Sequence, residues 1–225
     1  MKIEAVLFDM DGLMVDTESL STKALISSAK KQDYEMTKEE TLQVLGFTEA
    51  AIYKFWENYF EDSHVDGKKL ADDHYDYIEE VLFTTGPDKM PNVEELLVYL
   101  KENNYKIAVA SSSNIDHIEN NMEKTRLRKY IDKIASGQEV SNGKPAPDVF
   151  LLAAERLGVK PENCLVLEDS KSGIKAGHAS GATVFMVPDM FKPDEECIEI
   201  ANRILKNLGE VINILEEEND KDFNR

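Results

Sequence analysis

Apolar and polar positions fall into alternating blocks along this chain. Short, mostly apolar segments occupy residues 3–8, 106–110, 133–135, 164–167 and 182–187. Such runs are typical of strands that are buried on both faces of a parallel sheet. Segments with helical periodicity separate several of them, at residues 93–101, 115–125 and 147–157. Strands that alternate with helices predict an α/β fold with a doubly wound parallel sheet, similar to a Rossmann fold.

The pattern changes after the first predicted strand. Apolar residues then recur at helical spacing, as at Leu20 and Ala24, and clusters of β-branched residues are rare. This spacing predicts an all-helical insert with polar outer faces. We therefore expect two domains, a core formed by residues 1–15 and 86–225 and a helical cap formed by residues 16–85.

Composition limits the class of protein and its partners. The 225 residues include 44 Asp and Glu against 26 Lys and Arg, which gives a formal net charge of −18. An acidic surface repels nucleic acids and anionic lipids, so we expect neither as a partner. Two cysteines are too few for a disulfide framework, and the first residues lack the pattern of a signal peptide, which favours the cytoplasm. We expect a monomer.

Polar residues follow three of the predicted strands. These are Asp9 and Asp11 after the first strand, Ser111 at the end of the second, and Glu168 and Asp169 after a later one. Lys144 lies in a loop just before a predicted helix. In open parallel sheets, ligands bind beyond the carboxyl ends of the strands. We therefore expect these side chains to converge at one edge of the sheet.

Carboxylates that converge repel one another, and a hard divalent cation relieves this repulsion. Mg²⁺ takes oxygen ligands and commonly shares its shell with a substrate phosphate. We predict a Mg²⁺ site formed by Asp9, Asp11, Asp169 and Glu168.

The same residues suit phosphoryl transfer. Asp9 directly follows a buried strand, so it is the candidate nucleophile that would form an aspartyl-phosphate. Asp11 is the candidate general acid and base. Ser111 can donate its hydroxyl to a phosphoryl oxygen, with Ser112 as a further phosphate-binding candidate, and Lys144 supplies a positive charge.

Each of these residues also has a structural interpretation. The two aspartates could cap a helix, Ser111 could be a turn residue, and Lys144 could be a solvated lysine. Glu168 could orient a neighbouring group instead of binding the metal. The four histidines have no metal-ligand spacing and are predicted to be surface or structural residues.

Four stretches resemble the haloacid dehalogenase superfamily of phosphotransferases, and more closely its subgroup with a helical cap after the first strand. They are residues 6–18, 108–113, 143–150 and 165–174. The resemblance implies Asp9 as nucleophile, Asp11 as acid and base, and Ser111 and Lys144 on the phosphate. It also implies Mg²⁺ held by the Asp9 carboxylate, the Asp11 carbonyl and Asp169, with Glu168 nearby.

Two cap positions differ from the β-phosphoglucomutases of this subgroup. Ser21 stands where the mutase has a histidine, and Glu49 lies in the loop where the mutase has an arginine that binds a second phosphate. A glutamate would repel a second phosphate. We therefore expect a Mg²⁺-dependent phosphatase of a small sugar or nucleoside phosphate, with a sugar phosphomutase as the alternative.

A function of another class would be a phospho-accepting receiver module. That fold also places acidic residues, a hydroxyl and a lysine at the ends of parallel strands, but it lacks a helical insert after the first strand. Dehalogenase chemistry is disfavoured because those enzymes lack an aspartate at the position of Asp11.

Overall fold

The computed structural model describes residues 2–45, 47–190 and 192–223. The chain divides into two compact units, an α/β unit of Met1–Val15 and Asp88–Arg225 and a helical unit of Asp16–Pro87. The helical unit therefore ends at Pro87, two residues after the predicted end of the cap at residue 85.

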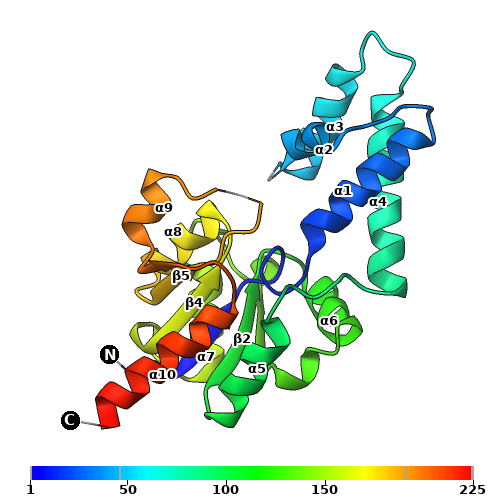
Figure 1. Ribbon diagram of the computed structural model, residues 1–225. Helices are drawn as coiled ribbons and strands as arrows, with labels where there is room; N and C mark the ends of the chain where they lie inside the picture. Colours follow the sequence, from blue (N-terminus) through cyan, green and yellow to red (C-terminus); the bar gives the residue numbers. More distant parts are fainter. Residues whose placement is uncertain (1, 46, 191, 224–225) are drawn as a thin grey trace. The chain divides into compact units, whose positions relative to one another are not determined.

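The α/β unit is built on one parallel sheet in the strand order β3-β2-β1-β4-β5-β6 (Figure 1). Its strands are β1 (Ala5–Phe8), β2 (Lys106–Ser111), β3 (Lys133–Ser136), β4 (Cys164–Glu168), β5 (Thr183–Met186) and β6 (Arg203–Ile204). The register aligns Phe8 with Val109 on one side and with Leu167 on the other. Three strands therefore end at nearly the same level, and the predicted doubly wound parallel sheet is confirmed.

Helices follow the strands and cover both faces of this sheet. They are α5 (Val93–Glu102), α6 (Ile115–Lys124), η2 (Arg128–Tyr130), η3 (Gly137–Glu139), α7 (Asp148–Leu157), η4 (Pro161–Asn163), α8 (Lys171–Ala179), α9 (Glu195–Ile200) and α10 (Gly209–Phe223). Successive residues of a strand point to opposite faces. Val6 and Phe8 accordingly pack with α5, α6 and α10, whereas Ala5 and Leu7 pack with α7 and α8.

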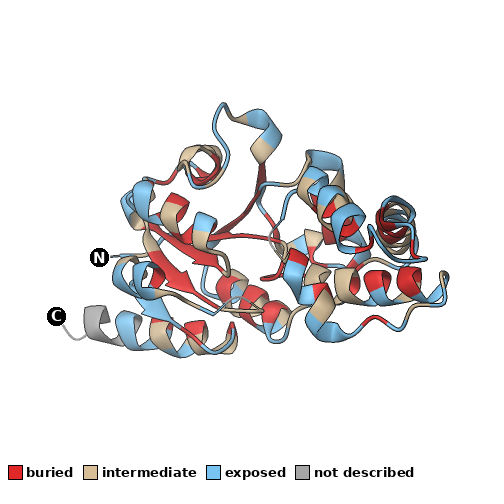
Figure 2. Ribbon diagram, turned by 90° about the horizontal axis from the view of Figure 1, so that it is seen from above, coloured by how far each residue is buried: buried red, intermediate tan, exposed pale blue. Residues whose placement is uncertain are grey.

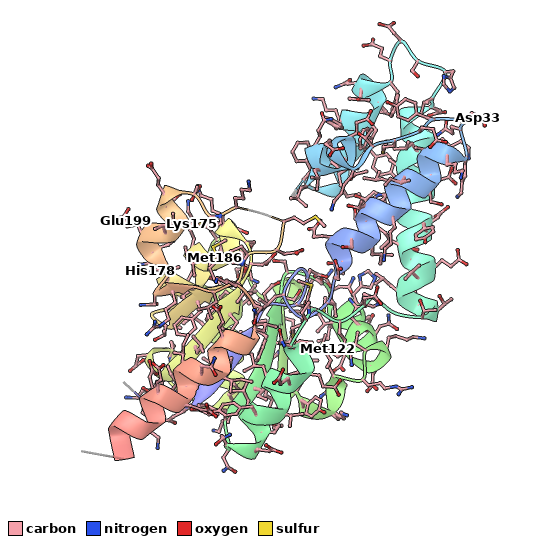
Figure 3. The ribbon with its side chains drawn as sticks, in the orientation of Figure 1. Asp33, Met122, Lys175, His178, Met186 and Glu199 are labelled. Carbon is pink, nitrogen blue, oxygen red and sulfur yellow. The ribbon has the colours of Figure 1, made fainter. Side chains whose placement is uncertain are left out.

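The strands at the centre of the sheet are buried along their whole length, as Figure 2 shows in red. Met122 on α6 and Met186 on β5, both labelled in Figure 3, belong to the two apolar clusters on opposite faces. The sheet edge that bears the site is therefore supported by apolar packing from both sides.

The turn after β1 fixes the direction of the first acidic residues. The Asp9 backbone N–H donates to the Leu167 carbonyl at 3.0 Å, which extends the pairing of β1 with β4 by one residue. The chain then turns sharply, because the Met10 carbonyl accepts from the N–H groups of Met14 and Val15. Gly12 has φ +77°, a left-handed conformation that favours glycine.

The helical unit contains α1 (Thr17–Lys30), α2 (Lys38–Thr41), η1 (Leu42–Val44), α3 (Glu49–Tyr59) and α4 (Gly67–Thr84). Its core surrounds the fully buried Trp56, which stacks with Phe60. Asp16 caps α1 by accepting from the Ser19 N–H at 2.9 Å, and Asp66 caps α4 in the same way. Among the described residues, no helix is both long and apolar enough to cross a membrane.

Candidate active site

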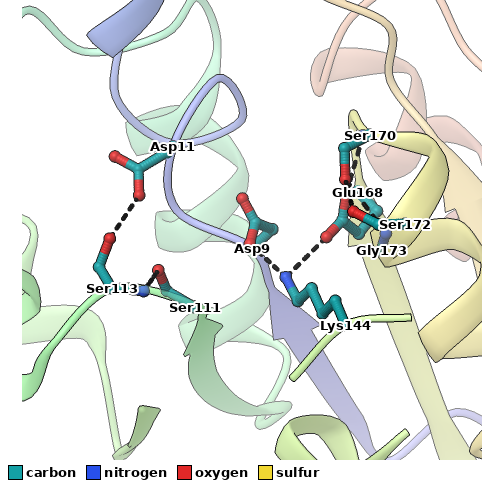
Figure 4. Close-up of polar contacts among 9 residues, drawn as sticks. All are labelled: Asp9, Asp11, Ser111, Ser113, Lys144, Glu168, Ser170, Ser172 and Gly173. Atoms are coloured by element: carbon teal, nitrogen blue, oxygen red, sulfur yellow. Dashed lines mark hydrogen bonds and ion pairs between the residues drawn. The ribbon is translucent and has the colours of Figure 1, made fainter. Parts of the chain in front are cut away.

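A buried lysine joins the ends of two neighbouring strands (Figure 4). The Lys144 ammonium donates to Oδ1 of Asp9, the residue after β1. It also donates to Oε1 of Glu168, the last residue of β4, at 2.7 Å. The side chain of Lys144 is 5% exposed and that of Glu168 is fully buried. The ammonium also lies 4.8 Å from the ring centroid of Phe150 on α7. These contacts hold Lys144 at the carboxyl edge of the sheet.

Glu168 uses both of its carboxylate oxygens within the protein. Its Oε2 accepts from the backbone N–H and from the hydroxyl of Ser170, each at 2.9 Å. The Ser170 hydroxyl oxygen in turn caps α8 by accepting from the Gly173 N–H at 3.1 Å. A Cβ on Gly173 would lie only 1.6 Å from Glu168 Oε1. The start of α8 therefore fixes Glu168, and Glu168 orients Lys144.

Asp169 lies beside the turn that follows β1. A Cβ on Gly12 would lie 2.5 Å from Asp169 Oδ2, so only glycine leaves room for this carboxylate. One oxygen from each of Asp9, Glu168 and Asp169 lies within 4.8 Å of the others. The structure thus brings together four of the predicted site residues from three segments that are far apart in sequence.

Serines after β2 contact the second aspartate. The Ser113 hydroxyl donates to Asp11 Oδ2 at 2.9 Å, and the Ser113 N–H donates to the hydroxyl oxygen of the buried Ser111 at 3.0 Å. A hydroxyl that accepts a hydrogen bond can still donate its own proton, so the Ser111 hydroxyl can donate to another acceptor. Ser112 is exposed. The contact of Ser113 with Asp11 is not among the predicted ones, although three consecutive serines at the end of the strand are a sequence signal for it.

Burial has the largest effect on the electrostatics of the site, and the crowding of carboxylates adds to it. Burial, together with Glu168 and Asp11, raises the pKa of Asp9 from 3.8 to about 7, although Lys144 opposes this change. Burial and the neighbouring Glu168 and Asp9 raise the pKa of Asp169 to about 9. Burial opposes the charged form of Lys144, but Asp9 and Glu168 outweigh it, so the pKa of Lys144 is raised.

The cluster fits a hard divalent cation. If all three carboxylates are ionised, the one ammonium that contacts the cluster among the described residues leaves two negative charges, and every candidate ligand atom is an oxygen. Burial is the largest cause of the raised pKa values of Asp9 and Asp169, and the neighbouring carboxylates add to it, so a bound cation would favour the charged forms of both side chains. Because both oxygens of Glu168 already accept hydrogen bonds, Asp9 and Asp169 are the better placed ligands.

Two predicted residues lie in the helical unit. The Ser21 hydroxyl lies 2.9 Å from Nε2 of His74, a buried histidine on α4. Glu49 is exposed in the first turn of α3. Residue 46, at the start of its loop, lies outside the described residues. The contact between Ser21 and His74 joins two helices and has no signal in the sequence pattern.

Comparison with known proteins identifies the family. Residues 6–187 match the haloacid dehalogenase-like hydrolases. A Thermotoga maritima protein named "Phosphorylated carbohydrates phosphatase" is 31% identical, with 96% of this chain and 99% of the relative covered. A Drosophila melanogaster protein named "Probable pseudouridine-5'-phosphatase" is 34% identical, with 93% and 91% covered.

A solved structure agrees with these sequence matches. A haloacid dehalogenase family hydrolase from Deinococcus radiodurans, crystallised with phosphate and sodium, superposes with a TM-score of 0.82 at 26% identity, covering 96% of both chains. The chain belongs to the family of haloacid dehalogenase-like hydrolases. The resemblance inferred from the four sequence stretches is thereby confirmed.

The close approach at Gly173 predicts a change in stability. Alanine normally favours a helix over glycine by up to about 1 kcal/mol, but Gly173→Ala must displace Glu168 and should lower the free energy of unfolding by about 1–3 kcal/mol. Urea denaturation measures this difference. Gly143→Ala is the matched control because a Cβ there meets nothing within 4 Å. Equal stabilities for the two variants would contradict the described contact.

The raised pKa of Asp169 predicts a dependence of stability on metal. Between its ordinary pKa of 3.8 and about 9, the folded state binds more protons at this group, so its contribution to stability falls as pH rises. In EDTA at pH 8, Asp169→Asn should therefore raise Tm by a few degrees, on the order of 1 kcal/mol. Millimolar Mg²⁺ should then stabilise the wild type but not the variant.

Removal of an exposed aspartate is the control for this measurement. Asp62→Asn deletes the same charge at an exposed position and should leave both Tm and its response to Mg²⁺ unchanged. If Asp169→Asn is less stable than the wild type in EDTA, or gains as much from Mg²⁺, the interpretation of the cluster is wrong.

Proposed function

We propose that this protein is a Mg²⁺-dependent phosphatase that hydrolyses the phosphate monoester of a small metabolite through an aspartyl-phosphate on Asp9. The contact that carries this proposal is the buried bridge from Lys144 to Asp9 and Glu168, beside Asp169. A carboxylate and a fixed positive charge lie together at one edge of the sheet, where open α/β sheets bind ligands, and this supports Asp9 as the nucleophile.

In the first step, a carboxylate oxygen of Asp9 forms a bond to phosphorus while the ester P–O bond breaks. The leaving alcohol oxygen takes a proton from Asp11, which the Ser113 hydroxyl orients at 2.9 Å. Lys144 neutralises negative charge on the phosphoryl group, and the Ser111 hydroxyl donates to one of its oxygens. When bound, Mg²⁺ would be held by Asp9 and Asp169 and would reduce the repulsion between two anions.

In the second step, Asp11, which has lost its proton to the alcohol, acts as the base. It takes a proton from a water molecule whose oxygen attacks phosphorus, and the bond from phosphorus to Asp9 breaks. This releases inorganic phosphate and restores the Asp9 carboxylate, so no other reactant is consumed. Splitting the reaction in this way lets one aspartate serve first as acid and then as base.

The names of two relatives support the substrate class. They refer to phosphorylated carbohydrates and to pseudouridine 5'-phosphate, both monoesters of hydroxylated organic molecules. A sugar or nucleoside monophosphate is therefore the proposed substrate. A sugar phosphomutase is the alternative from the same chemistry, since it would transfer the phosphoryl group without net release.

We also propose a cellular compartment and an oligomeric state for the protein. Cys164 and Cys197 are both free and buried, which supports a reducing compartment such as the cytoplasm. The formal charge of −18 disfavours close association between copies and supports a monomer.

Replacement of the proposed nucleophile tests this function. Asp9→Asn keeps the size of the side chain but removes the nucleophile, so phosphate release should fall by roughly 10³-fold or more. A panel of sugar and nucleoside monophosphates, assayed for inorganic phosphate with Mg²⁺ and with EDTA, provides the measurement. EDTA should abolish release by the wild type, and Mg²⁺ should restore it.

Asp62→Asn is the matched control and should retain wild-type turnover. An active Asp9→Asn variant would refute the proposed nucleophile. Isomerisation of a sugar phosphate without net phosphate release would instead support the mutase.

A further inference from the structure

A cavity of about 400 Å³ lies within the α/β unit, at the edge of the sheet opposite the candidate active site. The strands β2 and β3 begin at this edge, and their first residues, Lys106 and Lys133, line the cavity. The last turns of α5 and α7 add Lys101, Arg156 and Leu157. The volume lies in the range of about 300–1,000 Å³ that is typical of small-molecule sites. We call it the amino-edge cavity.

The charge of the amino-edge cavity is opposite to that of the whole chain. Acidic residues outnumber basic ones 44 to 26 in the sequence. In the described lining, however, four of the eight residues are lysine or arginine, and one, Asp132, is acidic. The segment 124–133, which leads into β3, alone contains five of the 26 basic residues. A local positive field on an acidic protein attracts anions to this place.

Contacts within the protein account for part of this positive charge. The Lys101 ammonium donates to Asp132 Oδ1, and the Ile107 N–H donates to Asp132 Oδ2 at 2.8 Å, so both oxygens of the lining carboxylate are engaged. Arg156 forms a two-point ion pair with Glu139, at 2.7 and 2.9 Å. Positive charge in the last turn of a helix is also favourable. The fold therefore explains Lys101 and Arg156 without a ligand.

Two lysines of the cavity keep donors that the protein does not use. The Lys106 ammonium donates to the Leu157 carbonyl at 2.8 Å, which leaves two of its three N–H donors. The Lys133 side chain is exposed and has no hydrogen bond or ion pair with the described residues. Tyr105 and Leu157, each 7% exposed, supply the apolar part of the lining. The cavity thus combines unused cationic donors with a buried apolar surface.

The kind of cation indicates the kind of anion. A lysine ammonium is a compact point charge, whereas the planar fork of an arginine matches a carboxylate. The fork of Arg156 is already paired with Glu139, so the unused donors belong to lysines. A phosphate monoester carries about −1.5 to −2 charges near pH 7 and three acceptor oxygens. It can accept from two lysines at once and gains more from them than a carboxylate with one charge.

We propose that the amino-edge cavity binds a small molecule that bears a phosphate group, at a site separate from the active site. Lys106 and Lys133 donate to the phosphate oxygens, and the organic part of the molecule packs against Tyr105 and Leu157. All of these residues belong to the α/β unit, and the inference does not depend on the proposed phosphatase activity.

Titration calorimetry of the full-length protein with phenylphosphonate tests this site. The P–C bond of this probe is not hydrolysed as a phosphate ester is, and benzoate is the matched carboxylate. Metal is removed with a chelating resin, because EDTA is itself a multivalent anion. Without a cation, the acidic cluster of the active site repels both probes. At pH 8, phenylphosphonate should bind at least about fivefold more tightly than benzoate, and raising salt from ~0.02 to ~0.2 M should weaken its binding several-fold.

Three variants locate the binding. Lys106→Gln and Lys133→Gln each remove one charge and should each weaken phenylphosphonate binding about fivefold, and the double variant should lose more than either. Glutamine at position 106 can still donate to the Leu157 carbonyl, so Tm should stay close to that of the wild type. Lys206→Gln is the matched control, since it removes the charge of an exposed lysine outside the cavity and should bind as the wild type does.

Each alternative result overturns the inference. Undetectable binding by the wild type, or undiminished binding by the double variant, would exclude the site. Equal weakening in Lys206→Gln would mean that only net charge matters. Equal affinity for benzoate would exclude selection of phosphate. If the wild type sediments as a dimer and the double variant as a monomer, the acidic surface of a second copy occupies the cavity instead.

Discussion

Repulsion among buried carboxylates at the carboxyl edge of the sheet is the constraint on which the site depends. Asp9, Glu168 and Asp169 lie close together, and in the described part of the chain Lys144 is the one ammonium that pairs with the cluster, which leaves two negative charges when all three carboxylates are ionised. Adjacent pairing of β1 and β4 brings these acids together, because Phe8 and Leu167 are in register directly before them. The excess negative charge makes this edge of the sheet suitable for a divalent cation, which can also bind a phosphoryl group.

Holding such a cluster destabilises the fold locally, and the surrounding structure offsets that cost. Apolar side chains pack on both faces of the sheet, and the capped start of α8 fixes Glu168 through Ser170. Gly12 and Gly173 provide the space that the carboxylates occupy. Functional sites often violate the rules that stabilise the rest of a fold, and here the violation consists of like charges held close together.

The sequence predicts the elements better than the contacts between their side chains. Apolar runs predict the parallel strands, and the polar residues at their ends predict that Asp9 and Asp169 lie close together, because strand ends share one edge. Lys144 is predicted from its place in the loop before a helix. The strand β6 is only two residues long, and both residues are exposed, so it lacks the apolar run that marks the other strands. For Glu168 the sequence leaves two roles open, metal ligand or orienting residue, because the choice depends on Lys144 and Ser170, which contact its two oxygens. The contact between Ser21 and His74 joins residues 53 positions apart and leaves no periodic signal.

Detection of the covalent intermediate tests the central claim most directly. A single turnover with the best substrate of the panel, quenched in acid within milliseconds and digested at low pH, preserves an acyl phosphate for mass spectrometry. We predict one added phosphoryl group on the peptide that contains Asp9, at the carboxylate of that residue. Phosphate release without a phosphorylated enzyme, or with the group on another side chain, would contradict it.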